Sequence, residues 1–172
     1  AWRGLMLDVS RHFFTKQEVK RFIDLMAEYK YNVFHWHLSD DQGWRVEIKS
    51  LPRLTDVGAW RAPRVGNWWE REPQSVTDSL TYGGFYTQDD IREVVEYARE
   101  RFITVVPEID VPGHSMALLT AYPEISCTGG PFHVNVGNTF YTKEENSLCV
   151  GKEKTFAILD MIFDELVDLF PS

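Results

Sequence analysis

Acidic and imidazole side chains gather at two places in this 172-residue sequence, and each place directly follows an apolar segment. The first group is Asp40 and Asp41, and the second is Glu108, Asp110 and His114. A carboxylate beside an imidazole can fix the ring's tautomer or tune a proton donor. The two groups together favour acid–base chemistry over the alternative, in which the acids only cap helices and His114 only opens one.

A second constellation is the segment His35-Trp36-His37, which reads as part of a strand. Two histidines two positions apart on a strand point to the same side. Such a pair can bind a metal inside a barrel, with Asp110 or His114 as a third ligand. The sequence holds no further ligand pattern, so we predict hydrogen-bonded histidines that line a site, with no metal and no cofactor. Arg11-His12 is either a site pair or an ordinary polar turn.

The elements that must position these residues alternate between strand and helix. A capping box at Thr15 and Glu18 marks one helix start, and Thr87 with two following acids marks another. The predicted strands are 5–9, 32–38 and 103–109, and the predicted helices begin at 15, 87, about 113 and about 154, the last one ending near 170. The almost continuous apolar run of 103–109 predicts a buried strand, and the spacing in the last helix predicts that Phe156 and Phe163 are buried. Such alternation indicates an α/β fold with parallel strands, whose carboxyl ends meet at one edge.

Periodicity does not choose between a doubly wound sheet and a (β/α)8 barrel, because only three of the eight barrel strands are visible. On strand 32–38 the aromatic and aliphatic side is expected to meet helices, and the histidine side a cleft or barrel interior. Residues from about 40 to 86 form a long connection between two predicted elements. A connection of this length usually carries function or small elements of its own. It contains Trp60, Trp68 and Trp69, which either stack on sugars or form a local core.

Composition and charge limit the partners and the compartment that fit this protein. The formal net charge of −8 disfavours nucleic acid as a partner, and no apolar run reaches the length of a membrane span. The length suits one domain. Cys127 and Cys149 flank a polar stretch, and we predict a disulfide between them rather than two buried thiols, which implies an oxidising compartment.

Four blocks of this sequence resemble glycoside hydrolase family 20, the β-N-acetylhexosaminidases. They are RGLMLDVSRH at 3–12, HWHLSDDQGWR at 35–45, YGGFYT at 82–87 and VPEIDVPGH at 106–114. The resemblance covers essentially the whole chain. It implies a (β/α)8 TIM barrel, of which residues 1–172 hold about the first three βα units as a partial catalytic domain, with no second domain.

The resemblance also implies an activity, the removal of terminal β-linked N-acetylglucosamine or N-acetylgalactosamine with retention of configuration. The substrate's own acetamido oxygen is the nucleophile in this family, so no enzyme nucleophile is needed. Asp40 and His114 would form a hydrogen-bonded relay to the acid glutamate. The sequence does not separate Asp40 from Asp41 in this role. Arg3 would bind sugar hydroxyls, and Asp110 would support the same corner and contact substrate.

The family's acid lies in a His-x-Gly-Gly-Asp-Glu block, which is absent from these 172 residues. We therefore expect residues 1–172 alone to be inactive, to need the remainder of the barrel as partner, and to expose sheet edges. The expected ligand is an oligosaccharide or glycoconjugate with a terminal N-acetylhexosamine, and the expected location is periplasmic or extracellular. Two alternatives stay open: a metal-dependent TIM-barrel hydrolase built on His35 and His37, and a non-catalytic sugar-binding module that uses Arg3 and the loop tryptophans.

Overall fold

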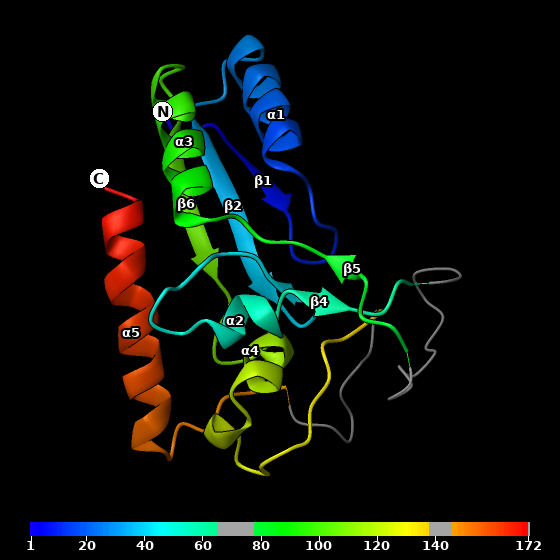
Figure 1. Ribbon diagram of the computed structural model, residues 1–172. Helices are drawn as coiled ribbons and strands as arrows, with labels where there is room; N and C mark the ends of the chain where they lie inside the picture. The colour runs from blue at the N-terminus through cyan, green and yellow to red at the C-terminus, as the bar shows by residue number, and fades with distance from the viewer. Residues whose placement is uncertain (65–77, 138–145, 172) are drawn as a thin grey trace.

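A parallel three-stranded sheet forms the centre of the molecule in a computed structural model, which describes residues 1–64, 78–137 and 146–171. Strand β2 (Val33–Asp40) lies between β1 (Gly4–Asp8) and β6 (Thr104–Ile109) and pairs in parallel with both (Figure 1). The short strand β3 (Gly43–Trp44) turns back antiparallel onto the end of β2. The predicted parallel α/β arrangement is confirmed, and Trp68 and Trp69 lie outside the described residues.

Helices α1 (Lys16–Glu28) and α3 (Gln88–Arg99) cover one face of this sheet. Both start at the predicted threonines, Thr15 and Thr87, each of which forms a complete capping box. These boxes satisfy backbone N–H groups that would otherwise lack partners in the first turn. The apolar faces of the two helices pack on Phe34, Trp36 and Leu38, all fully buried, as the alternation in β2 predicts.

The remaining elements are short, apart from the last helix. They are α2 (Arg53–Asp56), β4 (Trp60–Arg61) paired with β5 (Tyr82–Gly83), α4 (Met116–Ala121), a 3-10 turn (Pro123–Ile125) and α5 (Glu153–Leu169). The long segment 40–86 thus contains small elements of its own, as its length predicts. Among the described residues, no helix combines the length and apolar character needed to span a membrane.

Two expectations about burial are wrong. The near-continuous apolar run of β6 predicts a buried strand, yet Val105, Val106 and Ile109 are only half-buried, because β2 pairs with one edge of β6 and no described strand pairs with the other. On α5 we expect Phe156 and Phe163 inside, but they are 48% and 43% exposed.

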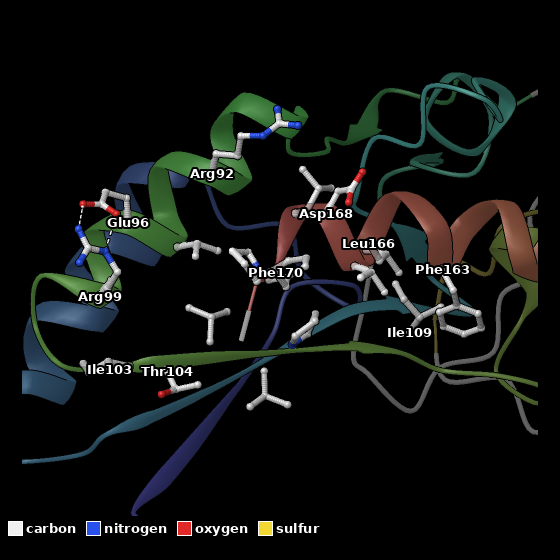
Figure 2. Close-up of a pocket in the computed structure, with 17 residues that line it drawn as sticks. Arg92, Glu96, Arg99, Ile103, Thr104, Ile109, Phe163, Leu166, Asp168 and Phe170 are labelled. Carbon is white, nitrogen blue, oxygen red and sulfur yellow. Dashed lines mark hydrogen bonds and ion pairs between the residues drawn. The ribbon is translucent and has the colours of Figure 1, made fainter.

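The buried stripe of α5 instead runs through Thr155, Ile158, Ile162, Leu166 and Leu169. Between α3, β6 and α5 lies an open apolar groove of about 940 Å³ (Figure 2). Its floor is the unpaired side of β6, and Phe163 and Val167 of α5 line it. The described part of the chain therefore exposes a sheet edge, as predicted.

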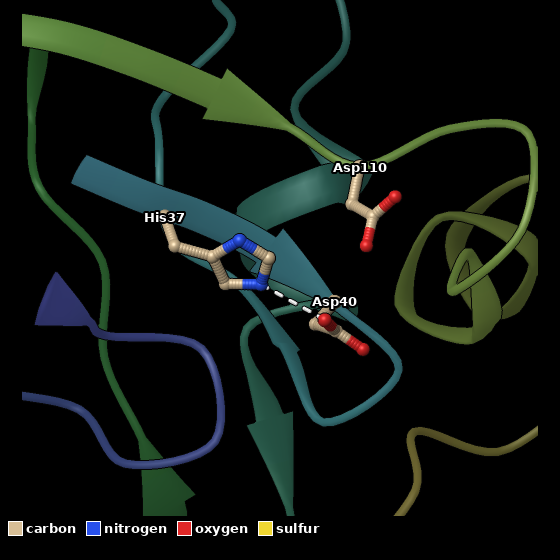
Figure 3. A group of neighbouring side chains, drawn as sticks. All are labelled: His37, Asp40 and Asp110. Atoms are coloured by element: carbon tan, nitrogen blue, oxygen red, sulfur yellow. Dashed lines mark hydrogen bonds and ion pairs between the residues drawn. The ribbon is translucent and has the colours of Figure 1, made fainter. Parts of the chain in front are cut away.

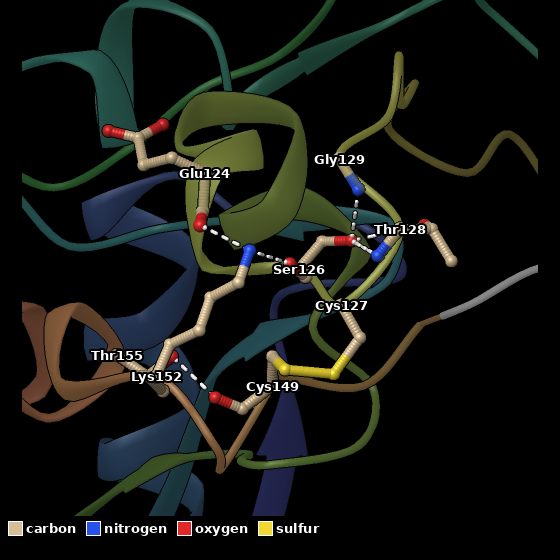
Figure 4. The surroundings of a disulfide bond; sticks show 8 residues. All are labelled: Glu124, Ser126, Cys127, Thr128, Gly129, Cys149, Lys152 and Thr155. Carbon is tan, nitrogen blue, oxygen red and sulfur yellow. Dashed lines mark hydrogen bonds between the residues drawn. A yellow bond between two sulfur atoms is a disulfide. The ribbon is translucent and has the colours of Figure 1, made fainter.

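A disulfide joins Cys127 to Cys149, in agreement with the sequence prediction (Figure 4). Lys152 reinforces this junction, because its ammonium donates to the backbone carbonyl oxygens of Glu124 and Ser126. The crosslink closes a loop that contacts Asp41, just after β2, through Asn135 and Asn146. Backbone hydrogen bonds from Ser115 to Asn146 and from Leu148 to Pro112 hold the returning end against the segment after β6.

Candidate active site

The two polar groups singled out in the sequence meet at the carboxyl end of the parallel sheet. β2 ends two residues later than predicted, so that Asp40 is its last residue instead of following it. The register of the sheet places His37 directly between Asp8 of β1 and Glu108 of β6. The carboxyl ends of parallel strands are where α/β folds build their sites.

Asp40 is the centre of this corner and is 1% exposed. Its Oδ1 lies 3.0 Å from His114 Nδ1 and accepts a hydrogen bond from the Asp41 amide. Its Oδ2 lies 2.8 Å from His37 Nε2 and 2.6 Å from the Arg11 guanidinium. Both carboxylate oxygens are therefore held, which fixes the orientation of the group, and a buried charge needs this degree of pairing.

His114 is the exposed member of the pair. It lies in the turn between β6 and α4 with a positive φ of 52°, and its side chain is 54% exposed while Nδ1 contacts Asp40. Only Nδ1 of this ring has a polar partner among the described residues. If Nδ1 carries the hydrogen that Asp40 accepts, Nε2 is free to accept a proton or hydrogen bond from a further group.

The structure separates Asp41 from Asp40, which the sequence does not. Asp41 accepts a hydrogen bond from the Met116 amide at 3.1 Å and lies 3.4 Å from the side-chain amide of Asn146. Its carbonyl also accepts from the Asn135 amide at 2.9 Å. Asp41 thus ties the disulfide-closed loop and the start of α4 to the end of β2, and its Oδ2 also lies 3.6 Å from His114 Nδ1.

Asp110 lies just beyond β6, and its carboxylate points into the same corner as His37 and Asp40 (Figure 3). Its amide donates to the Ser39 hydroxyl at 3.0 Å, which fixes the backbone there. No hydrogen bond to the Asp110 carboxylate is found among the described residues. The structure therefore brings Asp40, His114 and Asp110 together, as predicted.

Charge in this corner follows from burial and close pairing. Burial alone would raise the pKa of Asp40, but hydrogen bonds from His37 and the Asp41 amide, with the charge of Arg11, hold it below its ordinary value. Burial works against a charged His37, yet Asp40 and Glu108 outweigh it and raise the pKa of His37 to about 9. Burial and the nearby charge of Asp40 raise the pKa of Asp110.

Two sets of donors could in principle hold a metal: His37 with Asp40 and Asp110, and Asp40 with Asp41 and His114. Arg11 argues against the first set, because its guanidinium lies 2.6 Å from Asp40 and 3.1 Å from His37 Nε2. A cation already occupies the position from which a metal ion would reach these donors. His35 and His37 both contact Glu108, so these two rings are engaged by a carboxylate.

Arg3, which is predicted to bind sugar hydroxyls, does not lie in this corner. Arg3 precedes β1 at the amino end of the sheet, is exposed, and donates to the backbone oxygens of Lys30 and Ala1. A strand of five residues separates it from the opposite end, which is roughly 17 Å in extended backbone. The arginine that reaches the corner is Arg11, left open in the sequence between a site pair and a polar turn.

The loops around the corner rest on Arg45, which the sequence places in a block without revealing its part. It is fully buried, and its guanidinium donates to five backbone carbonyl oxygens, those of Val9, Ser10, Gln42, Ala59 and Gly84. Gly43 makes room for it, because a Cβ there would lie 2.3 Å from the guanidinium carbon. Arg45 therefore fixes the turn after β1, which carries Arg11, against the turn after β2.

Enzymes with a barrel-type α/β fold build their active sites at the carboxyl end of the parallel strands, where this chain holds its acid–imidazole pairs. The model of the glycosyl hydrolase family 20 catalytic domain matches residues 1–172. The chain belongs to this family, and its three parallel strands are the first part of a (β/α)8 barrel.

Named relatives agree with that assignment. The chain is 48% identical to a β-hexosaminidase of Vibrio furnissii and 44% identical to one of Porphyromonas gingivalis, covering 99% of this chain in each case but 27% and 20% of those proteins. A mutant Streptomyces plicatus β-hexosaminidase solved with the product GlcNAc superposes with a TM-score of 0.84 at 45% identity, over 100% of this chain and 31% of that one. The chain thus spans about a fifth to a third of its relatives' length.

Proposed function

We propose that the protein containing this chain is a β-N-acetylhexosaminidase, and that residues 1–172 supply the relay side of its active site. The observation that carries the proposal is Asp40, a fully buried carboxylate whose Oδ1 contacts Nδ1 of the exposed His114. An imidazole held by one carboxylate can hydrogen-bond a second one and set the pH at which that acid gives up its proton.

In the family, the second carboxyl belongs to the acid glutamate of a later barrel strand. We infer that this glutamate reaches His114 Nε2 from the part of the barrel that follows residue 172. Residues 1–172 contain no Gly-Gly-Asp-Glu block, so we expect them to show no turnover by themselves. Arg11 and Asp110, which line the same corner, are the groups that we expect to contact sugar hydroxyls or the acetamido group.

The substrate would be an oligosaccharide or glycoconjugate with a terminal N-acetylhexosamine. A Streptomyces plicatus relative bound to GlcNAc and a Vibrio harveyi exo β-N-acetylglucosaminidase solved with N-acetylglucosamine, at TM-scores of 0.84 and 0.79, support this class. The Cys127–Cys149 disulfide supports an exported protein, in the periplasm or outside the cell.

The test is hydrolysis of chromogenic sugars by the full-length gene product. We expect release from p-nitrophenyl N-acetyl-β-glucosaminide or its galactosaminide, with retained configuration, and no release from p-nitrophenyl β-glucoside. The last compound has the same leaving group but lacks the acetamido oxygen that acts as nucleophile. Equal rates on all three sugars would contradict substrate-assisted hydrolysis, and binding of N-acetylglucosamine without turnover would favour a sugar-binding module.

A further inference from the structure

Behind Asp40 lies a second layer of charged groups that the relay itself does not use. His37 is 4% exposed, and each of its ring nitrogens faces a carboxylate: Nε2 is 2.8 Å from Asp40 Oδ2, and Nδ1 is 2.8 Å from Glu108 Oε2. The contact with Asp40 is a hydrogen bond. The contact with Glu108 lies outside hydrogen-bond angles and is an ion pair only.

Glu108 is itself held from the other side. The same oxygen, Oε2, contacts His35 Nε2 on the half-exposed interior face of the sheet. Imidazoles and carboxylates therefore alternate in one chain of contacts that ends at the exposed ring, in the order His35, Glu108, His37, Asp40, His114. Four of these five groups lie on β2 and β6, and the register of the two strands pairs His37 directly with Glu108.

We propose that His37, clamped by Glu108, is a positioning residue that holds Asp40 in the orientation needed by His114. This inference rests on the proposed function. The two oxygens of Asp40 have different tasks: Oδ1 faces His114, and Oδ2 faces His37 and Arg11. Without His37, Oδ2 keeps only the guanidinium, and the carboxylate can rotate away from the His114 ring.

The charges around His37 favour its protonated form. Acidic groups face it from three elements: Asp8 on β1, Asp40 on β2 and Glu108 on β6, with Asp110 just beyond β6. Arg11 is the opposing cation, with one guanidinium nitrogen 3.1 Å from Nε2. A cationic His37 donates a hydrogen bond to Asp40, attracts Glu108 by its charge and keeps Asp40 ionised, which a neutral side chain of the same size cannot do.

The experiment compares His37→Gln and Glu108→Gln in the full-length gene product, with Glu100→Gln as matched control. Glutamine keeps a donor and roughly the volume of histidine but removes the charge, while Glu100 is an exposed acid beyond the end of α3, remote from the site. For each variant we would measure kcat, KM and the pH dependence of kcat/KM on the chromogenic N-acetylglucosaminide.

For His37→Gln we expect kcat to fall on the order of tenfold to a hundredfold with KM nearly unchanged, because orientation and not binding is lost. The acid limb of its pH profile should move up by about one pH unit, since Asp40 protonates more readily without the neighbouring cation. For Glu108→Gln the alkaline limb should move down, because His37 then loses its proton at lower pH. Wild-type kcat and unmoved limbs in both variants would overturn the proposal.

A measurement without turnover separates this proposal from the proposed function and covers a variant that fails to fold. Histidine-selective NMR of the wild-type protein follows the ring protonation of His37 with pH. If His37 keeps its proton well above the pH at which a free histidine loses it, the clamp stands even in a protein without hexosaminidase activity. Titration at the ordinary histidine value overturns the clamp while leaving the proposed function to the sugar assay.

Discussion

The end of β2 and the outer edge of β6 lie in the same sheet but differ in whether their side chains have partners within the described residues. At the end of β2, Asp40 has partners on both oxygens and Arg45 uses its guanidinium on five carbonyls, all within the described residues. At the outer edge of β6, an apolar groove lies open, and Phe163 and Val167 of α5 line it while 43% and 71% exposed.

This contrast indicates which parts of the barrel can form from the first three parallel strands alone. Hydrogen bonds and ion pairs among β1, β2 and β6 need only the registers of these strands, so the acid–imidazole cluster around Asp40 is already in place. Apolar burial at β6 needs a further layer, because exposed sheet edges and contiguous apolar patches mark surfaces that bind other chain segments. The following predictions test the two regions against each other in the full-length protein.

The largest effect is expected for Asp40→Asn. The change leaves His37 and Arg11 without their shared carboxylate charge, so kcat should fall on the order of a hundredfold or more, the range of general acid–base contributions. Loss of one partner from a buried ion cluster should also destabilise the fold by about 3 kcal/mol. Kinetics and thermal melting would measure both, with the exposed Asp89→Asn as control.

A large loss of stability is expected for Arg45→Lys. An ammonium has three donors where the guanidinium has five, so at least two buried carbonyls lose their partner, each costing roughly 1–3 kcal/mol. The free energy of unfolding should fall by about 3 kcal/mol, as measured by denaturant titration. Arg99→Lys makes the same change on the exposed end of α3 and should leave the free energy of unfolding nearly unchanged. Equal losses in both variants would contradict the stabilising role of the Arg45 guanidinium.

A smaller effect tests whether the groove at β6 is covered in the whole protein. Val167 is 71% exposed at the groove, and Val150 is 67% exposed in the turn after Cys149. If a later part of the barrel covers the groove, Val167→Glu should destabilise the full-length protein by roughly 2 kcal/mol, the order of one buried valine. Val150→Glu should change little. Identical melting temperatures for the two variants would show that the groove stays open.

The last prediction concerns a pH dependence of stability. His37 has its pKa raised to about 9 in the folded protein, whereas an unperturbed histidine titrates near 6.5. Its stabilising contribution is fully present below pH 6.5 and is lost as the pH rises through about 9. The stability advantage of the wild type over His37→Gln should therefore shrink between pH 6.5 and 9.5, and a constant difference in melting temperature would contradict the raised pKa.

Several features followed from the sequence because they depend on neighbours along the chain. The helix starts at Thr15 and Thr87 need only a capping residue and an acid three positions later, and both capping boxes form. The inward side of β2 follows from alternation, since Phe34, Trp36 and Leu38 stand two apart. The disulfide had a single possible pairing. The family followed from four ordered blocks that cover the chain, and the domain model confirms it.

The positions of two arginines and of two phenylalanines could not be predicted from the sequence, because they depend on where each element begins and ends and on what it packs against. Arg3 and Arg11 are both close to β1 in the chain, but only the strand's direction and limits decide that Arg11 reaches the carboxyl end of the sheet while Arg3 stays at the other. On α5, the pattern alone allowed Phe156 and Phe163 to be buried. Packing against the neighbouring elements instead buries the face of α5 that contains Ile158 and Ile162.

The composition and local patterns of this chain thus determined its parallel α/β character and its helix starts, and the resemblance to the family singled out Asp40 and His114 as a candidate pair. Only the tertiary structure decided that His37 lies against Glu108, residues 71 positions apart in sequence that the β2–β6 register brings face to face. Local signals reach a few residues along a helix or strand. The pairing of distant strands is set by packing of the whole sheet, and it is this pairing that sets the charge and orientation of the corner around Asp40.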